Sequence, residues 1–352
     1  MVRLVFWRLA RTVLAVWGLA SVVFLVSHRE AETAAQLALP EATDLSPGRA
    51  STLAGQEAAR RAVLQRLGLD LPVFYVSRGA GPSAEQWRWN GPRNQYHQWA
   101  AGLLHGDLGT SFRTGQAVTT RLGTALRFTL PLTGTAAVLA VLTALALAQR
   151  LAAGPWWQRA VRAVLLFVHA LPLFVVALLL LLLLANPEVV ALFPAYGLDE
   201  PTAEESGWSA AATYVLHMAL PVAALTLAAV PELTLQLEAA LTQELRTGYA
   251  VTARAKGLAT GAVVRHHALR NALLPTLTQI TELLPALVGG AVVVEVVFAL
   301  PGMGRLLAEA AAARDFPVLV GGVLLTGAAR LLALLLADLL YFWADPRIRW
   351  QP

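Results

Sequence analysis

Cysteine is absent from this chain of 352 residues, which excludes a disulfide framework, a thiolate nucleophile and a Cys-ligated metal centre. Charge is also scarce, because only 14% of the residues are charged, against about 25% in a soluble domain. Apolar residues take up the difference and make up 57% of the chain. This composition excludes a disordered chain, a collagen-like repeat and an ordinary soluble enzyme, and it indicates a membrane protein.

The motifs of several enzyme classes are missing as well. The single lysine, Lys256, lies between an alanine and a glycine, whereas a phosphate-binding loop needs Gly-Lys followed by Ser or Thr. A metalloprotease would need His-Glu-x-x-His, which does not occur. The seven histidines form no cluster with metal-ligand spacing. We therefore expect no catalytic residues, no metal and no cofactor, and any ATP must bind to a partner.

Six apolar stretches are long enough to cross a membrane, since a helix rises about 1.5 Å per residue and the hydrocarbon core is about 30 Å thick. They are residues 9–26, 126–148, 163–185, 214–235, 277–298 and 318–343. The first stretch follows basic residues and precedes small ones, so a cleaved signal peptide is the alternative. An uncleaved helix is the simpler account because five more spans follow. The sequence predicts an all-α membrane protein with six transmembrane helices.

The distribution of positive charge predicts which way the chain faces, because short loops rich in arginine and lysine stay in the cytoplasm. With the N-terminus inside, thirteen arginine and lysine residues fall in short inner segments. The outer loop at residues 186–212 has five acidic residues and no basic one. Both termini are therefore predicted to be cytoplasmic, and a large external loop follows the first helix.

These spans divide the chain into four parts. Residues 1–27 form the N-terminal segment and first helix, residues 28–117 an external region, residues 118–344 the main membrane domain, and residues 345–352 a cytoplasmic tail. The external region carries interleaved aromatic residues. They fit an aromatic belt at the membrane interface or a docking surface for a soluble partner: Trp87, Trp89, Tyr96 and Trp99.

The inner loop at residues 237–274 is the most informative segment. Its first half favours a short helix that Gly257 would end. A second amphipathic helix is expected around residues 263–269, and Pro275 suits the first turn of the next span. A short helix stopped by a glycine is a compact knob that could fit a groove on a cytoplasmic protein. The alternative is a basic amphipathic loop that lies on anionic lipid.

The motifs of this loop and of the segments around it resemble those of bacterial ABC importer permeases. The nearest branch is the oligopeptide/dipeptide/nickel permease family, in particular its first, long-loop subunit. The resemblance covers most of the chain and is tightest from residue 102 to residue 349, whereas residues 77–95 look like an insertion. It rests on five segments in the same order, namely residues 102–115, 252–258, 267–275, 295–304 and 313–349.

This resemblance implies a type I, MetI-like permease of the bacterial plasma membrane that imports short peptides, with nickel as an alternative solute. Residues 250–262 would form a coupling helix that docks on an ATP-binding subunit. The implied partners are a second homologous permease subunit, two ATP-binding subunits, an external solute-binding protein and membrane lipid, but no nucleic acid. The literal Glu238-Ala239-Ala240 lies too far upstream of Gly257 to belong to the motif. The implied coupling residues are Thr252, Ala253, Arg254, Ala255, Lys256 and Gly257.

Acidic residues inside the spans should face the helix bundle or water, because a carboxylate facing lipid costs several kcal/mol. Glu282 and Glu295 are candidates to line the solute pathway. For Glu295 a structural bond to the Pro301–Gly302 turn is the stronger interpretation, and for Glu282 a hydrogen bond to a neighbouring helix is an equal alternative. Glu232 is expected to pair with an arginine of a neighbour. The main alternative function, an ATP-independent secondary transporter, leaves the inner loop unexplained and predicts internal repeats that the sequence does not show.

Overall fold

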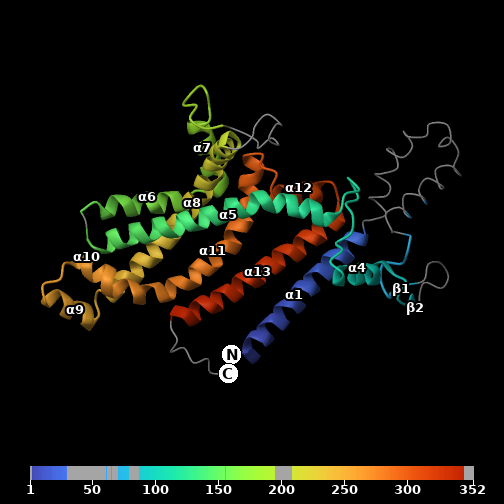
Figure 1. Cartoon of the computed structure of the whole chain (residues 1–352), viewed down its shortest axis with the longest axis horizontal. Helices are drawn as coiled ribbons and strands as arrows, with labels where there is room; N and C mark the ends of the chain where they lie inside the picture. The colour runs from blue at the N-terminus through green and yellow to red at the C-terminus, as the bar shows by residue number, and fades with distance from the viewer. Residues whose placement is uncertain are drawn as a thin grey trace. The chain divides into compact units, whose positions relative to one another are not determined.

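The computed structural model describes residues 2–29, 61, 65, 70–78, 87–154, 156–194 and 208–344 (Figure 1). The chain divides into two compact units. The first unit comprises residues 1–7, 124–306 and 329–352, and the second comprises residues 8–123 and 307–328. The predicted tail at 345–352 lies outside the described residues.

The described part of the chain is almost entirely helical. The first unit contains α6 (Gln158–Ala170), α7 (Leu173–Leu184), α8 (Trp208–Glu244), α9 (Gly248–Ala255), α10 (Thr260–Val263), the π-helix η2 (Val264–Ala268) and α11 (Leu269–Val297). The second unit contains most of α1 (Val2–Arg29), the strands β1 (Val76–Arg78) and β2 (Trp87–Trp89), and α4 (Gln95–Leu104). Like α1, three further described helices have residues in both units: α5 (Val118–Ala152), α12 (Met303–Ala312) and α13 (Phe316–Ala344).

Among the described residues, four helices are long and apolar enough to span a membrane, over Val118–Ala152, Ala211–Glu244, Pro275–Val297 and Phe316–Ala333. They coincide with the predicted second, fourth, fifth and sixth spans. The first predicted span appears as a shorter apolar stretch, Leu9–Leu25, within α1. The total of six spans and the side on which each end lies stay predictions.

The third predicted span, residues 163–185, is not one continuous helix. It is broken into α6 and α7, which meet at a bend of 106°. The break falls at Leu171 and Pro172, where Leu171 has the extended dihedral angles φ −81° and ψ 130°. Proline clashes with a helical residue before it, so the prediction of an uninterrupted helix was wrong. Counted as one crossing, the bent pair brings the described spans to five.

Small residues allow the helices of the first unit to pack closely. Ala136, Ala140 and Ala144 repeat every fourth residue along α5 and are buried in a cluster with apolar residues of α7, α8 and α11. Residues four apart share one face of a helix. The opposite face exposes Val138 and Leu142, as expected where lipid rather than protein covers the helix.

In the second unit, α4 packs against α1 through aromatic rings. The ring of Trp99 stacks on Phe24 at 4.9 Å and lies 5.6 Å from the ring of Trp17. Tyr96 lies 5.6 Å from Phe24 in an edge-on arrangement. The four aromatic residues singled out in the sequence therefore fall into two groups. Tyr96 and Trp99 pack against α1, whereas the two tryptophans of β2 remain exposed.

Two of the family-like segments, far apart in the sequence, meet at Asp315. This carboxylate is 1% exposed and accepts hydrogen bonds from the Ser111 hydroxyl at 2.5 Å and the Phe112 backbone N–H at 3.0 Å. Arg121 completes the network with an ion pair at 3.2 Å. A buried carboxylate needs such partners, so the charge ties the chain before α5 to the turn before α13.

Candidate functional site

The predicted coupling segment forms a short helix with a sharp end. Helix α9 runs from Gly248 to Ala255. Gly257 follows with φ +89°, a conformation that glycine adopts without a β-carbon penalty. Its N–H donates to the Arg254 carbonyl at 2.9 Å, and the Leu258 N–H donates to the Ala253 carbonyl at 3.3 Å. The predicted helix and its termination at Gly257 are therefore both present.

An apolar block fixes α9 to the rest of the first unit. Ala250 and Ala253 are buried in one cluster with residues of α8, α10, η2 and α11. Their partners include Leu237, Leu241 and Leu245 near the end of α8, together with Val263, Val264, Ala268 and Ala272. Figure 1 shows α9 and α10 together at the ends of α8 and α11. This apolar block holds the short helix and both long helices together.

Polar side chains add further links within the same region. The Arg254 guanidinium donates to the Leu245 carbonyl at 3.0 Å, near the end of α8. The Tyr249 hydroxyl donates to Glu244 Oε2 at 2.5 Å, and the Asn271 amide lies 3.4 Å from both groups. Burial, and then the bond to Glu244, raise the pKa of the Tyr249 phenol above its usual value. The phenol therefore keeps its proton and remains a donor.

The outer face of α9 presents a mixed surface. Of the six predicted coupling residues, Ala253 is buried in the apolar block, whereas Thr252, Arg254, Ala255, Lys256 and Gly257 are exposed. Apolar side chains lie exposed beside them, with Val251 51% and Leu258 42% exposed. The sequence analysis did not single out these two, although their position next to the motif was a usable signal. This combination of exposed apolar and basic groups suits contact with a partner protein better than exposure to water alone.

The second half of the loop differs from its prediction. No separate amphipathic helix lies there, because α10, η2 and α11 follow one another without a break from Thr260 to Val297. Val263 and Val264 are buried, but His267, which follows them at helical spacing and was expected in the same amphipathic pattern, is exposed. Pro275 consequently lies inside α11 and not in its first turn. The apolar part of that helix nevertheless starts at Pro275.

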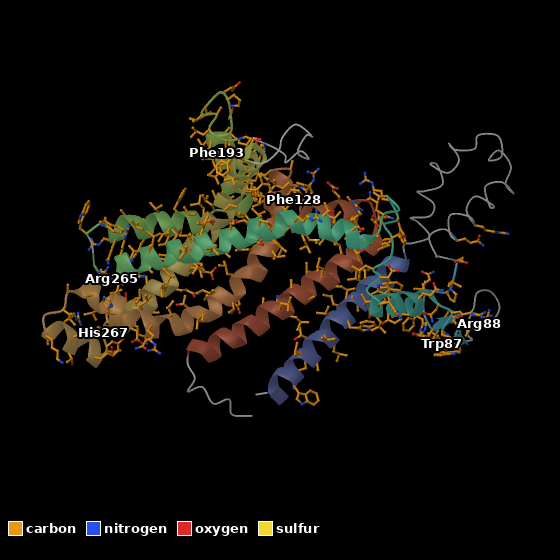
Figure 2. All side chains as sticks on the ribbon, viewed as in Figure 1. Trp87, Arg88, Phe128, Phe193, Arg265 and His267 are labelled. Carbon is orange, nitrogen blue, oxygen red and sulfur yellow. The ribbon has the colours of Figure 1, made fainter. Side chains whose placement is uncertain are left out.

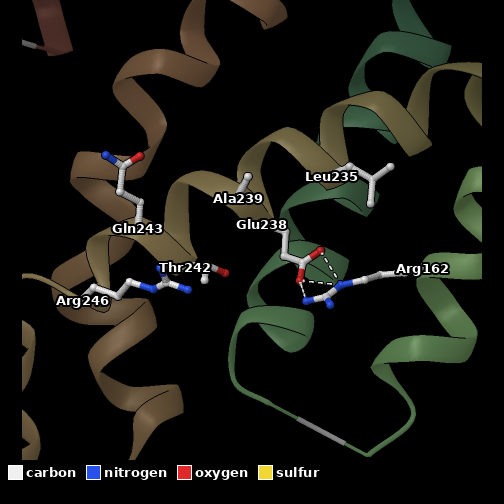
Figure 3. Close-up of a pocket in the computed structure, with 7 residues that line it drawn as sticks. All are labelled: Arg162, Leu235, Glu238, Ala239, Thr242, Gln243 and Arg246. Carbon is white, nitrogen blue, oxygen red and sulfur yellow. Dashed lines mark hydrogen bonds and ion pairs between the residues drawn. The ribbon is translucent and has the colours of Figure 1, made fainter.

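An ion pair joins α6 to α8 beside a cavity of about 500 Å³ (Figure 3). Arg162 Nε donates to Glu238 Oε1 at 2.9 Å and to Oε2 at 3.1 Å, and Arg162 Nη2 also bonds to Oε1. The side chain of Glu238 is 6% exposed and that of Arg162 is 42% exposed. Glu238 was rejected as part of the coupling motif, and its partner, 76 positions away, left no signal in the sequence.

Glu295 is another buried carboxylate, and it packs against Gly302 in the turn after α11, although its side-chain hydrogen bonds go to Thr129 and to the first turn of α12. Its Oε1 accepts from the Thr129 hydroxyl at 2.5 Å, and its Oε2 accepts from the Arg305 backbone N–H at 3.1 Å. Thr129 in turn accepts from the Met303 N–H at 2.8 Å. The carboxylate also fills the space that a β-carbon would need at Gly302. This arrangement favours the structural interpretation of Glu295 over a place in the solute pathway.

Glu232 and Glu282 lie on α8 and α11 and line one cavity of about 240 Å³. Both side chains are exposed. Gln279 adds a polar group, and the remaining lining is apolar and comes from α7, α8 and α11. The structure therefore brings together two acids that the sequence analysis had considered separately. Their cavity lies between helices that are apolar enough to span a membrane.

Comparisons with known proteins identify the family of this chain. A family described as "Binding-protein-dependent transport system inner membrane component" matches residues 123–350. The chain is 30% identical over 369 residues to the probable D,D-dipeptide transport system permease protein DdpB of Escherichia coli K12, covering 97% of this chain and 98% of that protein.

Two further relatives carry related descriptions. The di/tripeptide transport system permease protein DppB of Pseudomonas aeruginosa is 32% identical over 306 residues, with 82% of this chain and 84% of that protein covered. The oligopeptide transport system permease protein AppB of Bacillus subtilis is 31% identical over 259 residues, with 73% and 80% covered. These findings confirm the resemblance to ABC importer permeases. The chain belongs to the binding-protein-dependent transport system inner membrane component family, and it is a multi-pass protein of the bacterial inner membrane and not an enzyme.

Proposed function

We propose that this chain is one permease subunit of an ATP-driven importer of di- and oligopeptides. The relatives described above are permeases of dipeptide and oligopeptide transport systems, which supports peptides as the solute. In this proposal the chain forms half of the pathway beside a second homologous permease. Two separate ATP-binding subunits supply the energy, and an external binding protein delivers the solute.

The exposed surface of α9 carries the proposal for energy coupling. Val251, Thr252 and Lys256 are presented on a helix whose other face is buried in the apolar block. A partner that moves this helix also moves the ends of α8 and α11, because all three share that block. We therefore assign residues 250–262 as the docking segment for the ATP-binding subunit, with cytoplasmic orientation as predicted from the charge distribution.

The experiment compares two acidic substitutions in the complete transporter. Val251→Asp places a charge in the proposed interface, whereas Trp156→Asp makes a comparable change at a side chain that is 94% exposed outside α9. We expect Val251→Asp to lose both co-purification with the ATP-binding subunits and ATP-driven peptide uptake, while Trp156→Asp keeps both. Peptide accumulation by vesicles that hold the permeases without ATP-binding subunits or nucleotide would contradict the proposal.

We also assign Glu282 to the solute pathway, supported by its exposure in the cavity that it shares with Glu232 and Gln279. A carboxylate there suits the cationic amino terminus of a peptide. Uptake by Glu282→Gln, matched for expression, should show weaker peptide affinity. The control is Glu188→Gln, an exposed acid outside this cavity. Unchanged affinity and rate in the Glu282 variant would remove this residue from the pathway.

A further inference from the structure

Two tryptophans are exposed on one face of the small hairpin in the second unit. Strands β1 and β2 pair antiparallel, with Val76 opposite Trp89, Ser77 opposite Arg88 and Arg78 opposite Trp87, so that Arg78 lies at the end of the face that carries the tryptophans. Residues two apart on a strand share a face, so Trp87 and Trp89 point the same way and Arg88 points the other way. The indoles are 74% and 70% exposed, and Figure 2 labels Trp87 and Arg88 at this hairpin. Contiguous exposed apolar surface of this kind marks an interaction site.

The hairpin holds these side chains in a defined position. The Asn90 amide donates to the Phe74 carbonyl at 2.9 Å and to the Ser77 hydroxyl at 3.0 Å. The Asn90 backbone N–H donates to the Tyr75 carbonyl at 2.8 Å. The Tyr75 ring stacks on Trp89 with 5.8 Å between centroids and 20° between planes. Hydrogen bonds and ring stacking therefore hold the indole rings in position.

Contacts with α1 fix the height of the hairpin relative to the apolar part of that helix. The Tyr96 hydroxyl bonds to Trp17 Nε1 at 3.1 Å and to the Ser21 hydroxyl at 2.8 Å. Trp17 and Ser21 precede Leu25, the end of the apolar stretch, by eight and four residues. At about 1.5 Å per residue, the Tyr96 hydroxyl lies about 6 to 12 Å inside that end.

The rings between Tyr96 and the hairpin limit how far the indoles can extend beyond this level. The Tyr96 ring lies 6.1 Å from the Tyr75 ring, which lies 5.8 Å from Trp89. These two steps cover at most about 12 Å from the centre of the Tyr96 ring, which lies about 3 Å from its own hydroxyl, so the Trp89 ring lies no more than about 9 Å beyond the apolar stretch. The headgroup layer of one leaflet is about 5 to 7 Å thick. Trp89 is therefore within reach of the lipid headgroups if α1 spans the membrane.

We propose that the face formed by Val76, Trp87 and Trp89 inserts into the lipid interface and anchors the external region to the bilayer. Indole rings favour the headgroup level, where the apolar ring and its N–H are both accommodated. The rings of Tyr75 and Tyr96 connect this surface to α1. Apolar side chains of α1 are exposed as well, for example Leu14, which is 72% exposed. This inference uses only the expectation that α1 crosses the membrane and does not depend on the transported solute.

The test uses the natural absence of cysteine, which allows one nitroxide label at a time in the assembled transporter. Val76→Cys keeps both indoles and places the label on the proposed face, whereas Arg88→Cys places it on the opposite face of the same hairpin. Leu19→Cys reports on α1, where Leu19 is 56% exposed. Each labelled protein is reconstituted into vesicles of phosphatidylethanolamine and phosphatidylglycerol, and collision rates with oxygen and with a water-soluble nickel chelate are compared.

We expect the oxygen-to-nickel collision ratio to be several-fold higher at position 76 than at position 88, and highest at position 19. Equal ratios at positions 76 and 88, with position 19 in the membrane, would overturn the proposal. A label at position 76 that reports water and changes only when the external binding protein is added would identify a protein docking surface, which also overturns it. A label at position 19 that reports water would instead refute the predicted first span.

Discussion

The ion pair between Arg162 and Glu238 should respond unequally to the removal of its two partners. Arg162→Met leaves a carboxylate whose side chain is only 6% exposed, whereas Glu238→Leu leaves a guanidinium that is 42% exposed and can turn toward solvent. When a substitution leaves the buried charge of an ion pair without its partner, the loss of stability is about 3 to 5 kcal/mol. An exposed charge that loses its partner costs about 0 to 1 kcal/mol. Arg162→Met should therefore be less stable than Glu238→Leu by about 2 to 5 kcal/mol.

The double variant, Arg162→Met with Glu238→Leu, tests the reasoning further. Because an apolar pair of similar volume can replace a buried ion pair almost without loss, we expect its stability within about 1.5 kcal/mol of the original chain. Apparent unfolding midpoints of the purified proteins in detergent, taken at one scan rate, give the order of the four proteins. Equal losses in the two single variants, or a double variant that loses their sum, would refute the explanation from burial.

The remaining predictions concern local geometry. Gly257→Ala forces a left-handed conformation at φ +89°, which costs about 1 to 2 kcal/mol, so co-purification with the ATP-binding subunits should weaken. Gly302→Ala overlaps the Glu295 carboxylate and should lower the unfolding midpoint through a loss of about 1 to 3 kcal/mol. Gly134→Ala, in α5 and outside the docking segment, is the control for both, because Gly134 has an ordinary φ and open space. Tyr249→Phe removes a hydroxyl bond worth about 1 kcal/mol and should reduce peptide transported per ATP hydrolysed, whereas Tyr214→Phe should not.

Each of these three has a result that would contradict it. The glycine predictions fail if either variant matches Gly134→Ala. The tyrosine prediction fails if transport and ATP hydrolysis stay unchanged or fall in the same proportion, since the hydroxyl would then have no part in coupling the two.

The sequence predicted the long helices well because their signals are local. Runs of apolar residues of sufficient length identified α5, α8, α11 and α13. The stop at Gly257 was also visible, because a glycine directly after good helix formers has few other uses. The same reliance on apolar length hid the break at Pro172. That proline was a readable signal, but the leucines after it outweighed it in a count of apolar residues.

The parts that could not be predicted depend on contacts between distant residues. Nothing near Glu238 identifies Arg162 as its partner, and Glu232 and Glu282 share a cavity only because α8 packs on α11. The separation of the aromatic residues likewise depends on α1, which lies about 75 positions before Tyr96. Periodicity gives the buried face of a helix, but it does not say which helix covers that face.

Helix α8 is 37 residues long, which corresponds to about 55 Å from end to end. A tilt of only about 5° at the end held against α9 would move the other end by about 5 Å over that length. Two prolines, Pro221 and Pro231, lie inside the helix and each removes a backbone hydrogen bond. A bend at Pro231 would likewise enlarge a displacement applied at α9, because more of α8 lies beyond that turn than between it and α9.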